Sequence, residues 1–402
     1  MAMVVLLGLV PSAALGAVGP LQTTLAAAGD ISCPVGGAVT ATTCQDAATA
    51  ALVSAASPDR VLALGDLQYT NGSAAAFASE YDPVWGAFKA TTLPVPGNHE
   101  YLTAGASGYF GYWGATAGTA GQGWHVTRIG SWLLIGLNSN CADVGGCGAS
   151  SAQGQWLEAT LAASDAPCQL AYWHHPRFSS GLHGDNADVQ PLWEILQAHK
   201  AEVVLAGHDH EYERFAPMLA DGTVSDAGLA AFVVGTGGYD LRTFGAVHAG
   251  SQERIAKFGI AVLRLYETGW GAEFRATDGA VYPAGAEREC VTATAAPTSA
   301  ATASTATAGV VRTAQSIVRV WALEVGASRR LPQRSTQGLA LAWSSRTRGV
   351  CRVVRVATTV DGVRRVVSRV RGLEAGTCRL RAVNDGSGAY LPAAIAVAVR
   401  VR

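Results

Sequence analysis

An apolar run that ends in a polar cluster recurs five times in the first half of the chain. The runs are "TTLAAAGD" (23–30), "RVLALGD" (60–66), "TTLPVPGNHE" (91–100), "CQLAYWHH" (168–175) and "AEVVLAGHDH" (201–210). Short apolar runs bounded by glycine and polar residues are typical of buried strands. Helical patterns at 74–90, 152–163 and 188–200 separate several of them. Strands that alternate with helices predict an α/β sandwich with partly parallel sheets, whose ligands bind beyond the carboxyl ends of the strands.

The pattern changes after residue 210. Residues 230–238, 257–267 and 269–279 predict antiparallel strands that complete a second sheet. Residues 291–310 are mostly alanine and threonine, a composition that cannot build a core and predicts a linker. From 311 to 402 valine alternates with arginine or polar residues between glycine turns. This period of two predicts a small all-β sandwich.

The first 20 residues, "MAMVVLLGLVPSAALGAVGP", form an apolar run followed by small residues. They predict a signal peptide, because the run is too short and too interrupted by Pro11 to span a bilayer. The run lacks the usual basic n-region, so we expect its start to be truncated; the competing interpretation is an ordinary first strand. No later segment predicts a transmembrane helix in the mature chain.

Eight cysteines support export, because an even number in an exported chain predicts disulfides. Three local pairs stand out, and the remaining two cysteines would tie the end of the first domain back to its middle. The expected pairs are Cys33–Cys44, Cys141–Cys147, Cys351–Cys378 and Cys168–Cys290. Sequence alone does not fix this connectivity. We expect a protein that is secreted or held at the cell surface.

Composition and charge add an asymmetry to this picture. With 402 residues, 49% of them hydrophobic and 15% charged, the chain predicts two or three folded domains and not a disordered protein. Its net charge of −1 conceals a net +13 over 311–402 and −14 over 1–310. The arginines are expected to be solvated strand faces, to bind an anionic cell-envelope polymer, or to dock on the acidic part. Aromatic residues are too sparse there to indicate nucleic-acid binding.

The strand ends carry side chains that bind metals. His208 and His210 lie two residues apart, so in extended chain both imidazoles point the same way. Taken singly, each strand-end residue is a common turn former, helix cap or packed side chain. Together, carboxylate, imidazole and amide groups at five strand ends predict a site for two metal ions. The candidates are Asp30, Asp66, Tyr69, Asn98, His174, His208 and His210.

These motifs resemble those of the calcineurin-like metallophosphoesterases, and within them the purple acid phosphatases. The matching segments are 29–30, 65–69 ("GDLQY"), 97–100 ("GNHE"), 174–176 ("HHP") and 207–214 ("GHDHEYER"). The resemblance implies a four-layer α-β-β-α metallophosphoesterase sandwich for residues 21–290. The all-β part, 311–402, resembles the Ig-like modules of bacterial surface proteins through "GTCRLRAVNDGSGAY".

The resemblance also implies a ligand set. Many relatives carry a histidine where this chain has Ser32, and in the purple branch a tyrosine at the position of Tyr69 replaces it as ligand. Metal one would then be Fe(III), and metal two Zn(II), Mn(II) or Fe(II). Tyr69 as a packed aromatic is the alternative. The implied ligands of metal one are Asp30, Asp66, Tyr69 and His210, and those of metal two are Asp66, Asn98, His174 and His208.

The implied activity is that of a secreted phosphatase that hydrolyses small phosphomonoesters by in-line attack of metal-bound hydroxide. His99 would then protonate the leaving group, and His183 would bind phosphate or act as general acid. Gly184 stands where relatives often have a second histidine, and His175 is expected to point away from the site. A phosphodiesterase or nucleotidase on the same scaffold and a surface-binding protein with a vestigial site are the alternatives.

Overall fold

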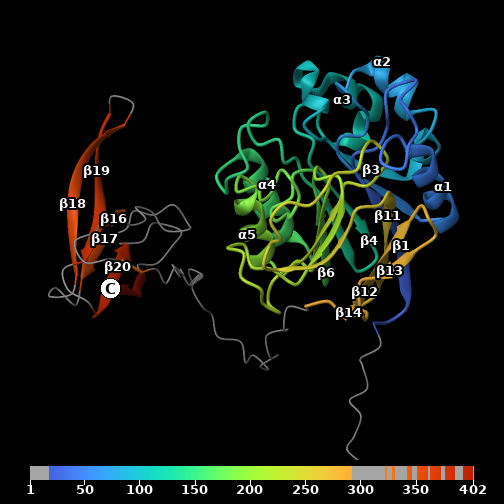
Figure 1. Ribbon diagram of the computed structural model, residues 1–402. Coiled ribbons are helices and arrows are strands. Elements are labelled where there is room, and N and C mark those ends of the chain that lie inside the picture. Colours follow the sequence, from blue (N-terminus) through green and yellow to red (C-terminus); the bar gives the residue numbers. More distant parts are fainter. Residues whose placement is uncertain are drawn as a thin grey trace, which may run out of the picture. The chain divides into compact units, whose positions relative to one another are not determined.

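The computed structural model describes residues 18–291 and, nearer the C-terminus, the backbone of seven strands between 322 and 401 (Figure 1). The chain divides into two compact units, Met1–Pro297 and Thr298–Arg402. Nearly all of the predicted signal peptide (1–20) and of the predicted linker (291–310) lies outside the described residues. No helix in the described part is long and apolar enough to cross a bilayer.

The first unit contains two seven-stranded sheets. In the first sheet β1, β2 and β3 are parallel, while β11 pairs antiparallel with β1 and β12 pairs antiparallel with β11. In the second sheet β5, β6, β7 and β9 are parallel. The first sheet comprises β1 (Leu21–Ala28), β2 (Arg60–Leu64), β3 (Thr92–Val95), β11 (Gly259–Tyr266), β12 (Gly269–Ala276), β13 (Val281–Pro283) and β14 (Arg288–Glu289). The second comprises β4 (His125–Ile129), β5 (Trp132–Gly136), β6 (Cys168–Tyr172), β7 (Val203–Ala206), β8 (Tyr212–Phe215), β9 (Ala230–Val234) and β10 (Ser251–Ile255).

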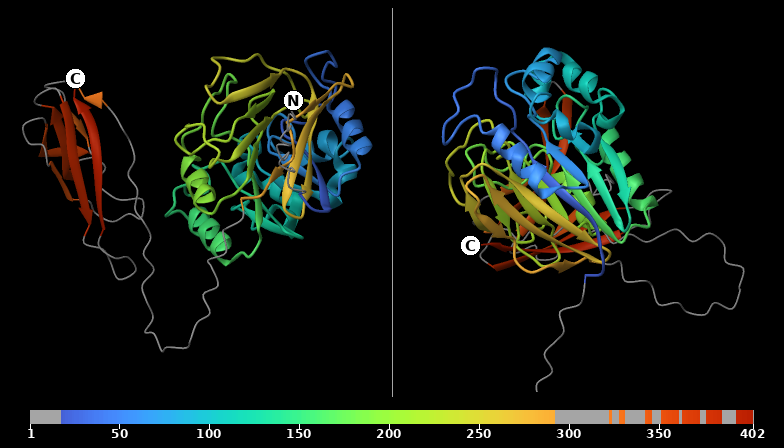
Figure 2. Two further views of the ribbon diagram at one scale, coloured as in Figure 1. Left: turned by 90° about the horizontal axis from the view of Figure 1, so that it is seen from below. Right: turned by 90° about the vertical axis from the view of Figure 1, so that its right-hand side faces the viewer.

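Helices cover the outer face of each sheet (Figures 1 and 2). The first sheet is covered by α1 (Asp46–Ala56), α2 (Ala74–Ala76) and α3 (Ser107–Trp113), and the second by α4 (Ala152–Ala163) and α5 (Gln190–Ala198). The second half of β1, residues 25–28, is apolar without a break and buried. Leu25 and Ala27 pack between the two sheets, whereas Ala26 packs against Val53 of α1 on the other face. A strand buried on both faces needs apolar residues at every position.

Three apolar cores therefore separate four layers. One lies between the first sheet and its helices, a second between the sheets, and a third between the second sheet and α4 and α5. Leu157 of α4 and Trp193 of α5, for example, pack on Ile135 and Val204. The predicted α-β-β-α sandwich is confirmed.

Two local predictions are wrong. The expected helix over 74–90 consists of α2, a π-helix at Phe77–Tyr81 and a 3-10 helix at Gly86–Thr91. Pro83 lies between the last two and lacks the N–H that a continuous helix needs. The strands expected to complete a second sheet separate instead, since β9 pairs parallel to β7 while β11 and β12 belong to the first sheet. An apolar run does not reveal which sheet it joins.

Three of the four predicted disulfides are confirmed. They are Cys33–Cys44, Cys141–Cys147 and Cys168–Cys290. The last one joins β6 of the second sheet to the residue after β14 of the first, so it ties the two sheets together. The predicted Cys351–Cys378 pair includes Cys378, whose side chain lies outside the described part.

The described backbone of the second unit is all-β. One sheet has the order β15–β21–β20–β17 and the other β16–β19–β18. Two antiparallel hairpins, β18–β19 and β20–β21, form most of it. The strands are β15 (Ala322–Leu323), β16 (Ser328–Arg330), β17 (Ala342–Ser345), β18 (Cys351–Val360), β19 (Val363–Gly372), β20 (Gly376–Asn384) and β21 (Ala393–Val401). Its assignment as Ig-like stays a prediction.

Candidate metal centre

Five parallel strands of the sandwich end at one place, and each presents a predicted ligand just beyond its last residue. Asp30 and Asp66 follow the ends of β1 and β2 by two residues, and Asn98 follows β3 by three. His174 and His208 follow β6 and β7 by two. Backbone hydrogen bonds join these ends, including Asp30 N to the Gly65 carbonyl (3.0 Å). The topology therefore gathers residues that lie up to 178 positions apart.

Asp66 lies at the centre of the cluster. Its Oδ2 is 3.2 Å from the Tyr69 hydroxyl, 3.3 Å from His174 Nε2 and 3.8 Å from His99 Nε2. Its Oδ1 accepts the backbone N–H of His99 at 2.8 Å. One carboxylate thus faces groups from both predicted ligand sets, as a bridging ligand must.

The four residues predicted for metal one contact one another. The Tyr69 hydroxyl lies 2.9 Å from Asp30 Oδ1 and 3.1 Å from His210 Nε2. His210 Nε2 is also 3.1 Å from Asp30 Oδ1. These side chains and Asp66 are at most 2% exposed. The group is a closed, oxygen-rich pocket with a single imidazole.

The residues predicted for metal two form an adjoining group around His174. Its Nε2 lies 3.1 Å from Asn98 Oδ1 and 3.2 Å from His208 Nδ1, in addition to its contact with Asp66. Asn98 and His208 are only partly buried. This second group is therefore the one open to solvent, and all seven predicted ligands lie in two groups that share Asp66.

Outer partners orient two of the histidines. His174 Nδ1 lies 2.9 Å from the Leu64 carbonyl, which can only accept, so Nδ1 carries the proton and Nε2 is free to bind a cation. His210 Nδ1 contacts the Asp240 carboxylate in the same way, which leaves its Nε2 facing Asp30. Asp240 was not among the site residues predicted from the sequence.

The buried carboxylates of the pocket require positive charge to balance them. Burial opposes ionisation of the imidazoles, yet Asp66 raises the pKa of His174 to about 9, and Asp30 and Asp240 raise that of His210 to about 10. Burial, with Asp30 and Asp66, raises the pKa of Tyr69 well above its ordinary value. Protons thus balance the buried carboxylates in the metal-free protein, and metal ions would displace them. The donor set of carboxylates, imidazoles, amide and phenol fits two such ions.

The backbone of the site is strained where the ligands attach. Asp30, Asp66 and His208 have φ values of 60°, 48° and 72°, which side chains other than glycine rarely adopt. The preceding glycines keep space free. A Cβ on Gly65, itself at φ 85°, would lie 2.7 Å from the His174 ring, and one on Gly97 would lie 2.1 Å from Asp66 Oδ1. These positions therefore exclude larger residues.

Glu100 holds two ligand-bearing loops together, a role that the sequence reading missed. Its fully buried carboxylate accepts the backbone N–H groups of Asp66 (2.9 Å), Leu67 (2.8 Å) and Gly97 (2.6 Å). Burial and the nearby Asp66 raise the pKa of Glu100 to about 7. Its place in "GNHE", directly after His99, was the only signal in the sequence.

The two predicted catalytic histidines lie at the edge of the cluster. His99 Nδ1 is 2.7 Å from the Thr70 carbonyl, so Nδ1 carries the proton there and Nε2 faces Asp66. The His183 ring lies 4.3 Å from that of His208, and its backbone N–H donates to Asp209 Oδ1 (3.0 Å).

His175 does not point away as expected. Its ring centroid lies 4.5 Å from that of His208, and its Nδ1 is 2.8 Å from the Ser139 hydroxyl. The ring nitrogens of His174, His175 and His208 lie within 4.8 Å of one another. Strand β6 has ended at Tyr172, so the strict alternation of strand side chains no longer applies at 174 and 175.

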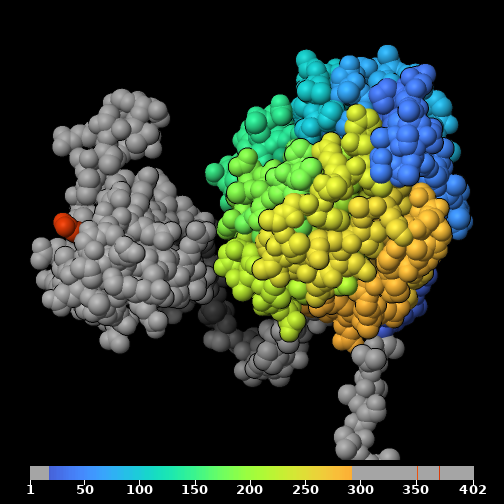
Figure 3. All heavy atoms as spheres, in the orientation of Figure 1, coloured from blue at the N-terminus to red at the C-terminus, as the bar shows by residue number. Residues whose placement is uncertain are grey.

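The loop of residues 235–250, after β9, adds further groups to the site. The Tyr239 ring stacks on that of Tyr69 at 3.5 Å between centroids. Its backbone is bonded to segment 30–44, with Tyr239 N donating to the Asp30 carbonyl (3.0 Å) and Cys44 N to the Tyr239 carbonyl (2.9 Å). In Figure 3 the yellow atoms of this part of the chain lie against the blue atoms of the N-terminal segment.

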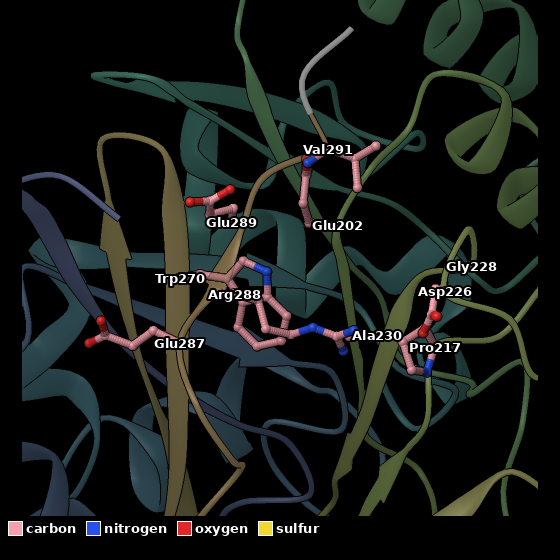
Figure 4. A pocket seen from close by; sticks show the side chains of 10 residues that line it. All are labelled: Glu202, Pro217, Asp226, Gly228, Ala230, Trp270, Glu287, Arg288, Glu289 and Val291. Atoms are coloured by element: carbon pink, nitrogen blue, oxygen red, sulfur yellow. The ribbon is translucent and has the colours of Figure 1, made fainter. Parts of the chain in front are cut away.

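A separate pocket of about 370 Å³ lies at the other end of the strands (Figure 4). Glu202, which lines it, directly precedes β7, whereas His208 follows that strand. Trp270 and Arg288 line it as well, and none of the predicted ligands does. Tyr109 and Trp113, in the segment of residues 105–124, are buried in the core between the first sheet and its helices.

Comparison with known proteins confirms the resemblance. Residues 23–212 match the family model of calcineurin-like phosphoesterases. The chain is 26% identical to purple acid phosphatase 15 of Arabidopsis thaliana over 219 residues, which are 45% of this chain and 40% of the relative. It is 32% identical to an acid phosphatase of Aspergillus ficuum over 81 residues, 19% of this chain and 13% of the relative. The chain thus spans well under two thirds of either relative's length.

A solved structure shows the same fold. The purple acid phosphatase from yellow lupin (Lupinus luteus) seeds superposes with a TM-score of 0.53 at 20% identity, covering 66% of this chain and 53% of that one. At this identity the similarity concerns the fold alone. The four-layer sandwich is therefore a metallophosphoesterase fold.

Proposed function

We propose that this protein is a dinuclear metal-dependent phosphatase that hydrolyses small phosphomonoesters. The observation that carries the proposal is the position of Asp66, whose single Oδ2 faces Tyr69 on one side and His174 on the other. A shared carboxylate between two groups of metal-binding side chains is the arrangement of a two-metal site. The matches to acid phosphatases support the reaction class.

Asp30, Asp66, Tyr69 and His210 would hold the first ion, and Asp66, Asn98, His174 and His208 the second. Tyr69 favours Fe(III) at the first position, because a phenol oxygen is a hard ligand and burial raises its pKa, so a highly charged cation replaces its proton most readily. The imidazoles and amide of the second group suit Zn(II), Mn(II) or Fe(II). When bound, the two ions supply Lewis-acid activation of water and neutralise phosphoryl charge.

Two histidine side chains of the protein then orient the phosphoryl group and protonate the leaving group. His99 is 25% exposed on its side chain and has its Nε2 3.8 Å from Asp66, so it can reach both the ion-binding edge and solvent. We assign it the transfer of a proton to the leaving alkoxide. His183, beside His208, is assigned to contact the phosphoryl oxygens.

We also infer that the protein is exported. Three disulfides among residues 33–290 support this, since such bonds persist in oxidising compartments. Binding of an anionic cell-envelope polymer by the arginine-rich residues 311–402 stays a prediction.

The test is hydrolysis of p-nitrophenyl phosphate by protein stripped of metal and then reconstituted. Release should depend on metal and fall more than about a hundredfold in Asp66→Asn, since even outer partners of metal ligands cost 10- to 100-fold. Asp165→Asn is the matched control, because that carboxylate is 95% exposed. Reconstituted protein that cleaves bis(p-nitrophenyl) phosphate but not the monoester would replace the proposal with a phosphodiesterase. Cleavage of neither would leave a vestigial site.

A further inference from the structure

Arg242 belongs to the loop after β9 and is fixed in place by its backbone. Its N–H donates to the His210 carbonyl at 3.1 Å, and three residues later Gly245 N donates to the Ser180 carbonyl at 2.7 Å. The first bond anchors the loop to a predicted metal ligand and the second to the segment that carries His183. Arg242 is therefore held between these two parts of the site.

The Arg242 side chain connects the same two parts. Its Nη1 donates to His183 Nε2 at 2.5 Å, and its Nε lies 3.8 Å from Asp240 Oδ2, the carboxylate behind His210. The side chain is 28% exposed, so one edge of the guanidinium remains open to solvent. An anion that reaches the His183 edge of the cluster would thus meet a cation that is already oriented.

The direction of this hydrogen bond limits what His183 can do. A guanidinium has donors only and keeps its charge at any ordinary pH, so His183 Nε2 must be the acceptor. An imidazole nitrogen that accepts this bond has no proton to give. In this arrangement the positive charge belongs to Arg242, and His183 Nε2 cannot act as a general acid while it accepts this bond.

We propose that Arg242 recognises the phosphoryl group and makes the site favour dianionic monoesters over monoanionic diesters. This rests on the proposed function. The N–H groups of the guanidinium bind two oxygens of one phosphate in a planar fork. On binding, a phosphoryl oxygen replaces His183 Nε2 as the acceptor of Nη1. The stronger the negative charge of the phosphoryl group, the more this contact contributes.

The experiment measures binding of inorganic phosphate to zinc-reconstituted protein by isothermal titration calorimetry. We compare wild type, Arg242→Gln, Arg242→Lys and the surface control Arg128→Gln, which removes an arginine paired with exposed Asp165. Loss of charge-assisted hydrogen bonds predicts that Arg242→Gln binds phosphate roughly 10- to 100-fold more weakly, and that Arg242→Lys, which keeps charge without the fork, is intermediate. The zinc content of all four proteins should be equal.

The same proteins are assayed with p-nitrophenyl phosphate and bis(p-nitrophenyl) phosphate. In Arg242→Gln the monoester-to-diester ratio of kcat/KM should fall about tenfold or more, mainly through the KM of the monoester. Unchanged phosphate affinity in Arg242→Gln, an unchanged ratio, or a loss of zinc that accounts for both effects would overturn the assignment. Wild-type protein that neither binds phosphate nor cleaves either ester would overturn the proposed function, and the assignment with it.

Discussion

Replacement of Glu100 perturbs the site without removing any predicted ligand. The Glu100 carboxylate accepts three backbone N–H groups, two from the loop that carries Asp66 and one from the loop that carries Asn98. Glu100→Ala leaves these three donors buried without an acceptor. At about 1–3 kcal/mol for each, the cost is about 3–9 kcal/mol, and water entering the cavity will bring it toward the lower end.

Glu100→Gln is the graded version of the same change. The amide keeps the shape and one acceptor oxygen, but its NH2 group faces a backbone donor in place of the second oxygen. We expect the free energy of unfolding to fall by about 1–3 kcal/mol. Because the two loops also position metal ligands, metal affinity should fall about 10- to 100-fold in both variants.

The assays are urea unfolding followed by tryptophan fluorescence and metal competition with a chelator. Glu158→Ala serves as the control, because that side chain is 57% exposed and its ion pair with His199 lies at the surface. It should stay within about 0.5 kcal/mol of wild type. If the free energy of unfolding of Glu100→Ala lies within about 1 kcal/mol of the wild-type value and the variant retains metal equally well, Glu100 does not hold the two loops together.

Three further outcomes follow from particular side chains. Tyr69→Phe should abolish the visible charge-transfer absorption of Fe(III)-reconstituted protein, and a retained band would show that the phenol is not a ligand. Burial lowers the pKa of His125 to about 4, so stability present above pH 6.5 is lost as pH falls through 4, by at most about 3 kcal/mol. In urea unfolding, His125→Gln should reduce the pH dependence of the free energy of unfolding over this range, whereas His199→Gln, which changes a surface pair, should not. An equal pH dependence in both variants would refute this assignment. Cys168→Ser with Cys290→Ser opens a 122-residue loop and should lower the free energy of unfolding by about 3–5 kcal/mol, and no measurable loss would contradict the inter-sheet role.

The strand-end residues were predictable because both signals are local. Apolar runs ending in glycine indicate where strands stop, and the polar residue that follows, such as Asp30 or His208, must then lie at the edge of the sheet. The topology then brings these residues together, because the parallel strands end at the same edge. Residues 152–163 were equally predictable, and α4 has those bounds.

The remaining site residues were not predictable because their roles depend on tertiary contacts. Asp240 and Arg242 lie in a loop outside the named strands and helices, and hydrogen bonds to His210, to segment 30–44 and to Ser180 hold this loop at the site. His175 was misplaced because its strand had already ended. The interruption of the helix at 74–90 was in contrast visible in the sequence, in Pro83, and the prediction gave it too little weight.

The metal content of the protein tests the central claim most directly. After reconstitution and exhaustive dialysis, elemental mass spectrometry should find two metal ions for each wild-type chain. Asp66→Asn should retain fewer than one, because its carboxylate is shared by both groups, while Asp165→Asn should retain both. One ion or none in wild-type protein, or two in Asp66→Asn, would contradict a dinuclear centre bridged by Asp66.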